Sequence, residues 1–182
     1  MADRALSIGL PLLGILVVGL AFYAVTSPST YQHVAMSIQV GLTIQLIARD
    51  LSHSKITPAA DIGRAGGVMA TTRYLKDGIG GNYPIYTLDT TGIIYVQSQV
   101  ARQYTLGDFF EVWGNALGPT NTLGRPANFT STGVVDYYWA MCLKGPQGPI
   151  PTADWGSLVL INGGVISLVY SEVGCSYRAW RS

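Results

Sequence analysis

The chain has 182 residues, enough for one ordinary domain with a buried core in addition to a terminal segment. Only 12% of its residues are charged, about half the usual share, and the formal net charge is +1. A nucleic-acid-binding surface needs clustered Lys and Arg, so this composition argues against a nucleic-acid partner and favours an exported domain or one covered by neighbouring subunits.

An uncharged, apolar run from Ser7 to Val25 lies close to the start of the chain. A membrane-spanning helix needs roughly 20 such residues, whereas the core of a signal peptide has about 7 to 15 and precedes a cleavage site with small residues. Phe22 stands at the −3 position of a cut after Ala24, which makes that cleavage site poor. We therefore expect residues 1–28 to form a retained transmembrane anchor, with a cleaved signal peptide as the alternative.

The orientation of this anchor is inferred from the residues on either side of it. Arg4 is the only basic residue before the run, which weakly favours a cytoplasmic N-terminus. Pro28 disfavours continuation of the helix, and no second apolar span follows. We expect residues 29–182 to form one extracytoplasmic domain at the cytoplasmic (inner) membrane.

A long strand is expected at the start of the domain. From Met36 to Leu46, apolar residues alternate strictly with polar residues or glycine, which predicts a strand with one buried face. From Ser52 to Pro84 the many glycines and Pro58 predict irregular structure with one short helix. Residues 84–100 predict a hairpin that turns at Asp89–Gly92.

The clearest predicted helix spans Leu106 to Leu117. Thr105 is its expected N-cap, Asp108 stands at the capping-box position, and Gly118–Pro119 is expected to end it. Large apolar residues recur at helical spacing and predict one face that packs onto a sheet: Leu106, Phe109, Phe110, Trp113 and Leu117.

Three strands are predicted after a polar loop that holds Asn128. They cover residues 134–143, 157–161 and 165–171, and the dipeptide Asn162–Gly163 predicts a tight hairpin between the last two. The order of helix, loop and antiparallel meander predicts an α+β domain, a mainly antiparallel β-sheet with one well-defined packing helix.

The C-terminal half also resembles a known class of domains. The segments TLGDFFEVWGNALGPT, VVDYYWAMCL and VLINGGVISLVY are similar to the helix, Gly-Pro turn and strands of small bacterial envelope domains. Such domains include the outer-membrane assembly lipoproteins and domains of uncharacterised envelope proteins from green non-sulfur bacteria. The resemblance covers about the last 85 residues of the chain and implies a protein-binding or scaffolding role. The chain departs from the lipoproteins in having no lipobox cysteine.

Two kinds of covalent site are predicted in the exported part. Cys142 and Cys175 are expected to form a disulfide, because thiols pair in an oxidising compartment, with two buried free thiols as the alternative. Asn128 begins an Asn-Phe-Thr sequon, which makes it a candidate glycosylation site if the host glycosylates exported proteins.

Motifs for catalysis, metal binding and cofactor binding are weak. The two histidines, His33 and His53, lack the spacing of metal ligands. No Gly-x-Ser-x-Gly elbow is present, and Glu111 and Glu172 are the only glutamates. The sequence therefore predicts no catalytic residue, no metal site and no cofactor, and hence a protein that is not an enzyme.

The leading hypothesis is a non-catalytic, single-span accessory or structural subunit of a larger membrane complex. Its anchor would contact lipids and other transmembrane subunits, and its domain would contact protein partners on the extracytoplasmic side.

Two alternatives to this hypothesis remain. One is a pilin-like subunit of an extracellular filament, because Arg4–Ser7 fits a prepilin-peptidase site. Against it, Gly9 replaces the glutamate expected in type IV pilins, and a period-two strand replaces their long helix. The other alternative is an exported ligand-binding domain.

The uncharged run from Ser7 to Val25 leads to a first prediction. The full-length chain should require detergent for extraction from native membranes and should resist a carbonate wash, because the apolar run is long enough to span a bilayer. Fractionation followed by intact-mass measurement checks this. Full-length chain in the soluble fraction contradicts the anchor.

Overall fold

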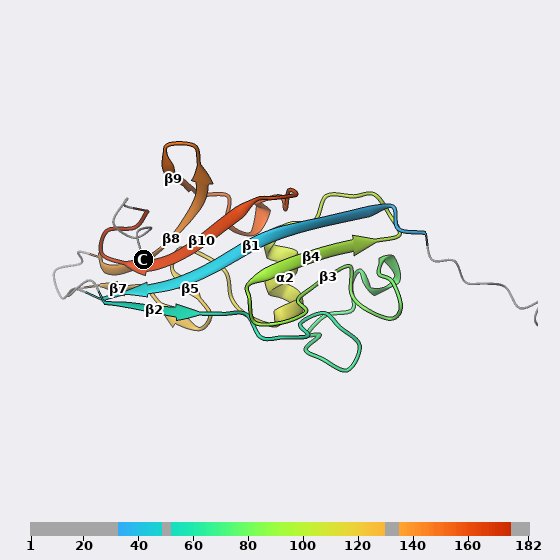
Figure 1. Cartoon of the computed structure of the whole chain (residues 1–182). Helices are drawn as coiled ribbons and strands as arrows, with labels where there is room; N and C mark the ends of the chain where they lie inside the picture. Colours follow the sequence, from blue (N-terminus) through green and yellow to red (C-terminus); the bar gives the residue numbers. More distant parts are fainter. Residues whose placement is uncertain (1–32, 49–51, 130–134, 176–182) are drawn as a thin grey trace, which may run out of the picture. The chain divides into compact units, whose positions relative to one another are not determined.

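The structure, a computed structural model, describes residues 33–48, 52–129 and 135–175. The predicted anchor, residues 1–28, and the boundary after it lie outside these ranges. Within the described ranges, no helix has both the length and the apolar character needed to cross a membrane. The described residues form a mainly β-sheet domain with one α-helix, which is consistent with the predicted α+β class (Figure 1).

One sheet of eight strands forms most of the domain (Figure 1), and its main path runs in the order β3-β4-β1-β10-β8-β7. These strands are β3 (Ile85–Tyr86), β4 (Ile93–Ser98), β1 (Met36–Ile47), β10 (Val165–Ser171), β8 (Val135–Gly145) and β7 (Asn128–Phe129). Two more strands join this path, β2 (His53–Ile56) beside β1 and β9 (Gly148–Thr152) beside β8. A separate small hairpin pairs β5 (Asn121–Thr122) with β6 (Arg125–Pro126).

Strand β1 confirms the strand predicted from alternation. Val40, Leu42 and Ile44 are buried, whereas Ser37 and Gln39 are exposed. Successive side chains of a strand point to opposite faces, so one face of β1 lies on the core. Strand β4 pairs with its first half, β2 pairs with its last residues, and β10 lies on the other side.

The predicted antiparallel meander is wrong in its last part. Strand β10 runs parallel to β1, with Gly41 opposite Val165 and Leu46 opposite Tyr170. Its other neighbour, β8, is antiparallel and forms a hairpin with β9 that the sequence did not predict. Because β10 is buried along nearly its whole length, it needs a strand on each side, and β1 and β8 fill these places.

Residues 157–161 were predicted as a strand, but Ser157 belongs to the 3-10 turn Trp155–Ser157, Leu158 after it is extended, and Val159 makes an isolated antiparallel bridge with Thr105. The backbone of this segment bonds to the start of the helix, where the N–H of Leu106 donates to Leu158 O and the N–H of Leu160 donates to Tyr104 O, both at 2.8 Å. Leu160 is still buried in the core. The predicted hairpin at Asn162–Gly163 is therefore wrong, although the chain does turn there.

The helix, α2 (Leu106–Trp113), begins as predicted and ends earlier. Thr105 and Asp108 form both hydrogen bonds of a capping box, with the Thr105 hydroxyl accepting from the Asp108 N–H. Gly114 ends the helix in the left-handed conformation, with φ of 75°, and a side chain there would collide with Ala70. The end predicted at Gly118–Pro119 is wrong because this earlier glycine is the C-cap.

The helix packs onto one face of the sheet through the predicted aromatic face. Phe109 and Phe110 are buried and Trp113 is partly buried, with ring centroids 5.3 to 5.8 Å apart. The same core contains residues from the central strands: Val40, Leu42, Ile44, Ile94, Val96, Trp139, Met141, Ile166 and Leu168. This face of the sheet is called the core face below, and the opposite one the outer face.

The segment before the β3–β4 hairpin is largely irregular, as predicted. The expected short helix is a single 3-10 turn, Leu75–Asp77. The hairpin turns at Asp89, whose carboxylate accepts hydrogen bonds from the hydroxyl and from the N–H of Thr91. These two bonds, the hydroxyl bond first, hold the pKa of Asp89 below its ordinary value. Strand β2 lies in a stretch whose composition did not predict a strand.

The packing of α2 leads to a second prediction. Phe109→Ala should lower the free energy of unfolding by about 3 to 5 kcal/mol, because it leaves a cavity at a fully buried site. Trp113→Ala should cost less, because part of its side chain is exposed. Val100→Ala, at an exposed site, is the control and should change stability by at most about 0.5 kcal/mol. Chemical denaturation measures all three, and equal losses for Phe109→Ala and Val100→Ala contradict the packing.

Candidate functional site

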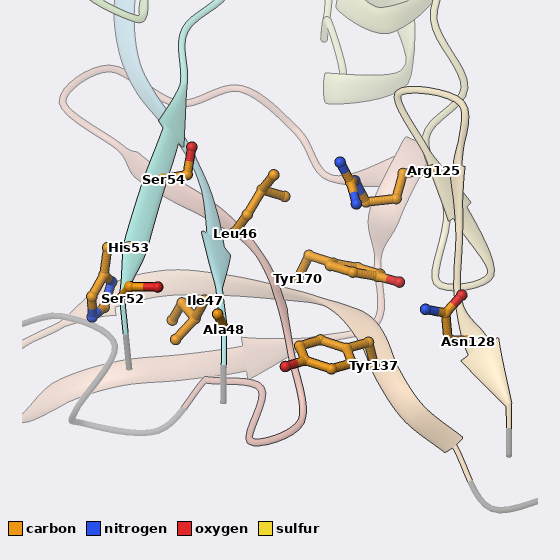
Figure 2. A pocket seen from close by; sticks show the side chains of 10 residues that line it. All are labelled: Leu46, Ile47, Ala48, Ser52, His53, Ser54, Arg125, Asn128, Tyr137 and Tyr170. Carbon is orange, nitrogen blue, oxygen red and sulfur yellow. The ribbon is translucent and has the colours of Figure 1, made fainter. Parts of the chain in front are cut away.

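A pocket of about 340 Å³ opens on the core side at one end of the sheet (Figure 2). It is called the β2–β7 pocket here. The end of β1 and the start of β2 line one side, and β6 and β7 line the other. Two tyrosines, Tyr137 from β8 and Tyr170 from β10, complete the lining. Residues from six strands thus meet at one place.

The two tyrosines form an aromatic floor. Their rings stack with centroids 5.5 Å apart, and Trp139 packs against Tyr170 at 5.1 Å. Tyr170 is only 6% exposed, and its hydroxyl donates to the carbonyl of Pro126 at 3.1 Å. A buried phenol with its hydrogen bond satisfied is a fixed surface, so the floor is rigid.

Arg125 is held over this floor by its own backbone. The indole N–H of Trp139 donates to the carbonyl of Arg125 at 2.9 Å, next to the Tyr170 bond to Pro126. The exposed Arg125 side chain then places its guanidinium 5.4 Å from the centre of the Tyr170 ring, within the range of a cation–π contact. Two aromatic donors from the sheet therefore position the cation.

The opposite wall is set by the pairing of β1 with β2. Leu46 lies opposite Ser54, and both side chains are on the side of Tyr170 (Figure 2). His53 lies opposite Ile47, one residue out of phase, and its imidazole points away from Arg125 and Tyr170. The wall that faces Arg125 therefore combines an apolar side chain with a hydroxyl.

The electrostatics of the pocket are dominated by burial and by one cation. Burial raises the pKa of Tyr170, the guanidinium of Arg125 lowers it, and Tyr137 and the carboxylate of Asp136 raise it. Among the described residues that line the pocket, Arg125 carries a guanidinium and none carries a carboxylate. The pocket thus presents a positive charge beside an aromatic surface.

A second hollow, of about 400 Å³, lies on the outer face of the same strands. It is lined by polar residues that include Thr43, Gln45, Lys55 and Ser167. The side-chain oxygen Oε1 of Gln45 is buried there without a hydrogen-bond partner. Lys55 gives this hollow a cation that is separated from Arg125 by the thickness of the sheet.

The structure brings one predicted site residue to the β2–β7 pocket. Asn128 is exposed and lines it, but it lies in strand β7, not in the predicted loop. Its glycosylation stays a prediction. His33 and His53 belong to no metal-binding cluster among the described residues.

Sequence reasoning missed the residues that define the pocket. Arg125, Tyr137 and Tyr170 were not singled out. Tyr137 and Trp139 alternate along β8 and so share one face, and this period-two aromatic pair was the available signal.

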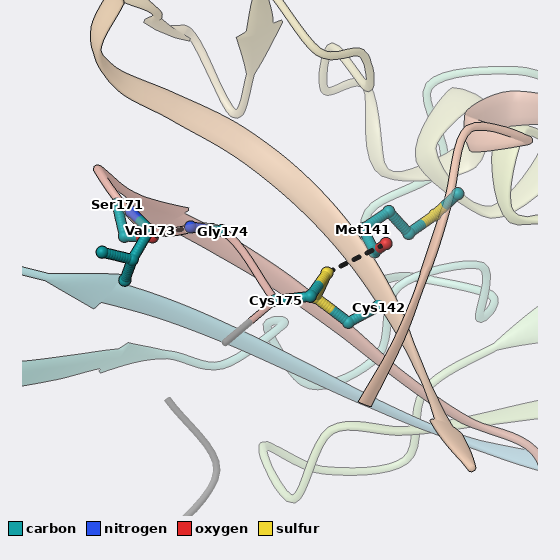
Figure 3. The surroundings of a disulfide bond; sticks show 6 residues. All are labelled: Met141, Cys142, Ser171, Val173, Gly174 and Cys175. Atoms are coloured by element: carbon teal, nitrogen blue, oxygen red, sulfur yellow. Dashed lines mark hydrogen bonds between the residues drawn. A yellow bond between two sulfur atoms is a disulfide. The ribbon is translucent and has the colours of Figure 1, made fainter. Parts of the chain in front are cut away.

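The predicted disulfide between Cys142 and Cys175 is present, with Cα atoms 5.8 Å apart (Figure 3). Ser171, at the end of β10, shapes the turn that leads to Cys175, because its hydroxyl accepts from the N–H of Gly174 at 2.8 Å. Gly174 has φ of 58°, and a side chain there would collide with the hydroxyl of Tyr138. The bridge packs with Ile47 and Val169 on the outer face.

The sulfur of Cys175 also lies 3.4 Å from the carbonyl oxygen of Met141, drawn as a dashed line in Figure 3. Neither sulfur of the bridge carries a proton, so this contact adds packing and no donated hydrogen bond.

Comparisons of the chain with protein-family models, with curated proteins and with solved structures found no match. The similarity of the C-terminal half to small envelope domains therefore stays a prediction.

The disulfide leads to a third prediction. Replacing both cysteines, Cys142→Ala with Cys175→Ala, should lower the free energy of unfolding by roughly 3 to 4 kcal/mol, because the bridge closes a loop of about 33 residues in the unfolded chain. Denaturation of the oxidised, reduced and double-variant proteins measures the loss. Non-reducing peptide mapping of native material should recover the bridged pair, and two free thiols there contradict it.

Proposed function

We propose that the chain is a non-catalytic, single-span accessory subunit of a larger membrane complex, with its domain on the extracytoplasmic side. The observation that carries this proposal is the disulfide between Cys142 and Cys175. Disulfides persist in oxidising compartments and are rare in the reducing cytoplasm. The uncharged run from Ser7 to Val25 supports the proposal, because it has the length that a span needs.

The short connection between this run and the domain supports a position near the membrane. Residues 26–35 separate the run from the first residue of β1, Met36. Ten residues reach at most about 35 Å when fully extended. A domain tethered so closely is available to the extracytoplasmic parts of neighbouring membrane subunits and has little reach beyond them.

The first described strand favours this proposal over a filament subunit. Residues Met36–Ile47 form strand β1, at a place where the usual type IV pilin continues its N-terminal helix. The alternation that buries Val40, Leu42 and Ile44 on one face suits a sheet and is incompatible with a helical stripe.

A second candidate function, an exported ligand-binding domain, is favoured by the β2–β7 pocket. Its volume of about 340 Å³ lies in the range of small-molecule sites, roughly 300 to 1,000 Å³. It also combines an aromatic floor with a few convergent polar groups, which is the usual make-up of such sites. The two candidates are compatible, since an accessory subunit can also bind a ligand.

The proposed location leads to a fourth prediction. Protease added to intact spheroplasts should digest the domain, because residues 29–182 are exported in this proposal, while a cytoplasmic control protein stays intact. Protection of the domain until the membrane is lysed contradicts the orientation.

The proposed role in a complex is tested separately. After extraction in a mild detergent, native mass measurement should place the 19.5 kDa chain in a particle with other membrane proteins. A chain that elutes alone in its detergent micelle contradicts the accessory role.

A further inference from the structure

We infer that the β2–β7 pocket binds a small polyol that carries an oxyanion, a carboxylate or a phosphate group. The inference deepens the second candidate function, ligand binding, and rests on it. Three features support it: a positioned guanidinium, polar groups that face it, and an aromatic floor.

The guanidinium of Arg125 is suited to an oxyanion. Its central carbon lies 5.4 Å from the centre of the Tyr170 ring, so the ring contacts one side of the cation, and its side chain is exposed to an incoming ligand. A planar fork of donors binds both oxygens of a carboxylate or phosphate at once. Since Trp139 and Tyr170 already hold the adjacent backbone, binding needs little further ordering of this strand.

The polar groups around Arg125 suit hydroxyl groups on the body of the ligand. Ser54 on one wall and Asn128 on the other supply a hydroxyl and an amide, each of which both donates and accepts hydrogen bonds. Leu46 and the tyrosine floor offer apolar surface for the C–H groups of the same body. A volume of about 340 Å³ admits one sugar-sized unit.

The charge of the pocket disfavours neutral and cationic ligands. A neutral ligand that covers Arg125 displaces water from the guanidinium, which costs free energy, and offers no opposite charge to compensate for that cost. Asp136, the carboxylate that acts on Tyr170, does not line the pocket. An oxyanion supplies the opposite charge that the described lining residues do not provide.

This ligand chemistry has two sources near a membrane. One is a soluble acidic polyol, such as a uronic acid or a polyol phosphate. The other is the headgroup of an anionic glycerophospholipid. Both present an oxyanion next to hydroxyl groups.

The test is a binding titration on the full chain in a neutral detergent. Glucuronate and glycerol 3-phosphate are compared with their uncharged counterparts, glucose and glycerol. Water-soluble dioctanoyl phosphatidylglycerol is compared with the phosphatidylcholine of the same chain length. Calorimetry measures the affinity, and the fluorescence of tryptophan, including Trp139 beneath the floor, gives a second readout.

Matched variants assign the binding to this pocket. Arg125→Gln should weaken binding of the charged probes roughly 10- to 100-fold, the range for lost hydrogen bonds to a charged group, and it leaves the backbone carbonyl that Trp139 binds in place. Lys55→Gln removes the same charge from the hollow on the outer face and should change the affinity less than about twofold. Ser54→Tyr fills the pocket from the opposite wall and should also abolish binding.

The outcomes separate the inference from the candidate function. Charged probes that bind, weaken with Arg125→Gln and tolerate Lys55→Gln support the inference, and the arm that binds identifies the source as soluble or lipid. If glucose and glucuronate bind with equal affinity and Ser54→Tyr abolishes the binding of both, the pocket binds ligands but does not require an oxyanion. That result retains the second candidate function and overturns the inference. Binding that survives in folded Ser54→Tyr or is lost in Lys55→Gln overturns the assignment to this pocket. If none of the probes binds, both the inference and the second candidate function, ligand binding, are overturned.

Discussion

The domain depends on the parallel pairing of β1 with β10 at the centre of the sheet. Gln39 and Asn162, which are 123 positions apart in the chain, meet through a backbone N–H and a side-chain oxygen at 3.0 Å. Ordering so long a loop has an entropic cost, which the burial of residues such as Ile44 and Leu168 offsets. Strands β4 and β2 attach to β1, whereas β8 attaches to β10. Without the central pair the sheet separates into two parts, and neither has a complete core.

Strand β10 also connects the pocket to the disulfide. Tyr170 points to the core face and forms part of the pocket floor, whereas Val169 points to the outer face and packs with Cys142. The chain turns after Ser171 and is fixed at Cys175. The bridge therefore restrains the end of the strand that supplies the floor. In an oxidising compartment, the same covalent bond that stabilises the domain also keeps Tyr170 in place.

The sequence predicted the elements whose causes are local. The alternation from Met36 to Leu46 determines which side chains of β1 face the core, and the capping box at Thr105 and Asp108 satisfies donors within one turn of helix. The end of α2 was less predictable because two stop signals compete. Gly114 takes the left-handed conformation and packs against Ala70, a contact between distant residues that no local pattern contains.

Non-local contacts decided what the patterns left open. Asn162–Gly163 makes a turn, with φ of 74° at Gly163, but the Asn162 oxygen accepts from Gln39 instead of closing a local hairpin. A turn signal predicts where the chain bends and leaves the partner strand open. The partner strand is decided by the burial of β10, which is buried on both faces and so belongs in the middle of a sheet. It therefore lies between β8 and the other long strand, β1. The pocket has the same origin, since Arg125 reaches Tyr170 only after β8 and β10 have come together to hold its backbone.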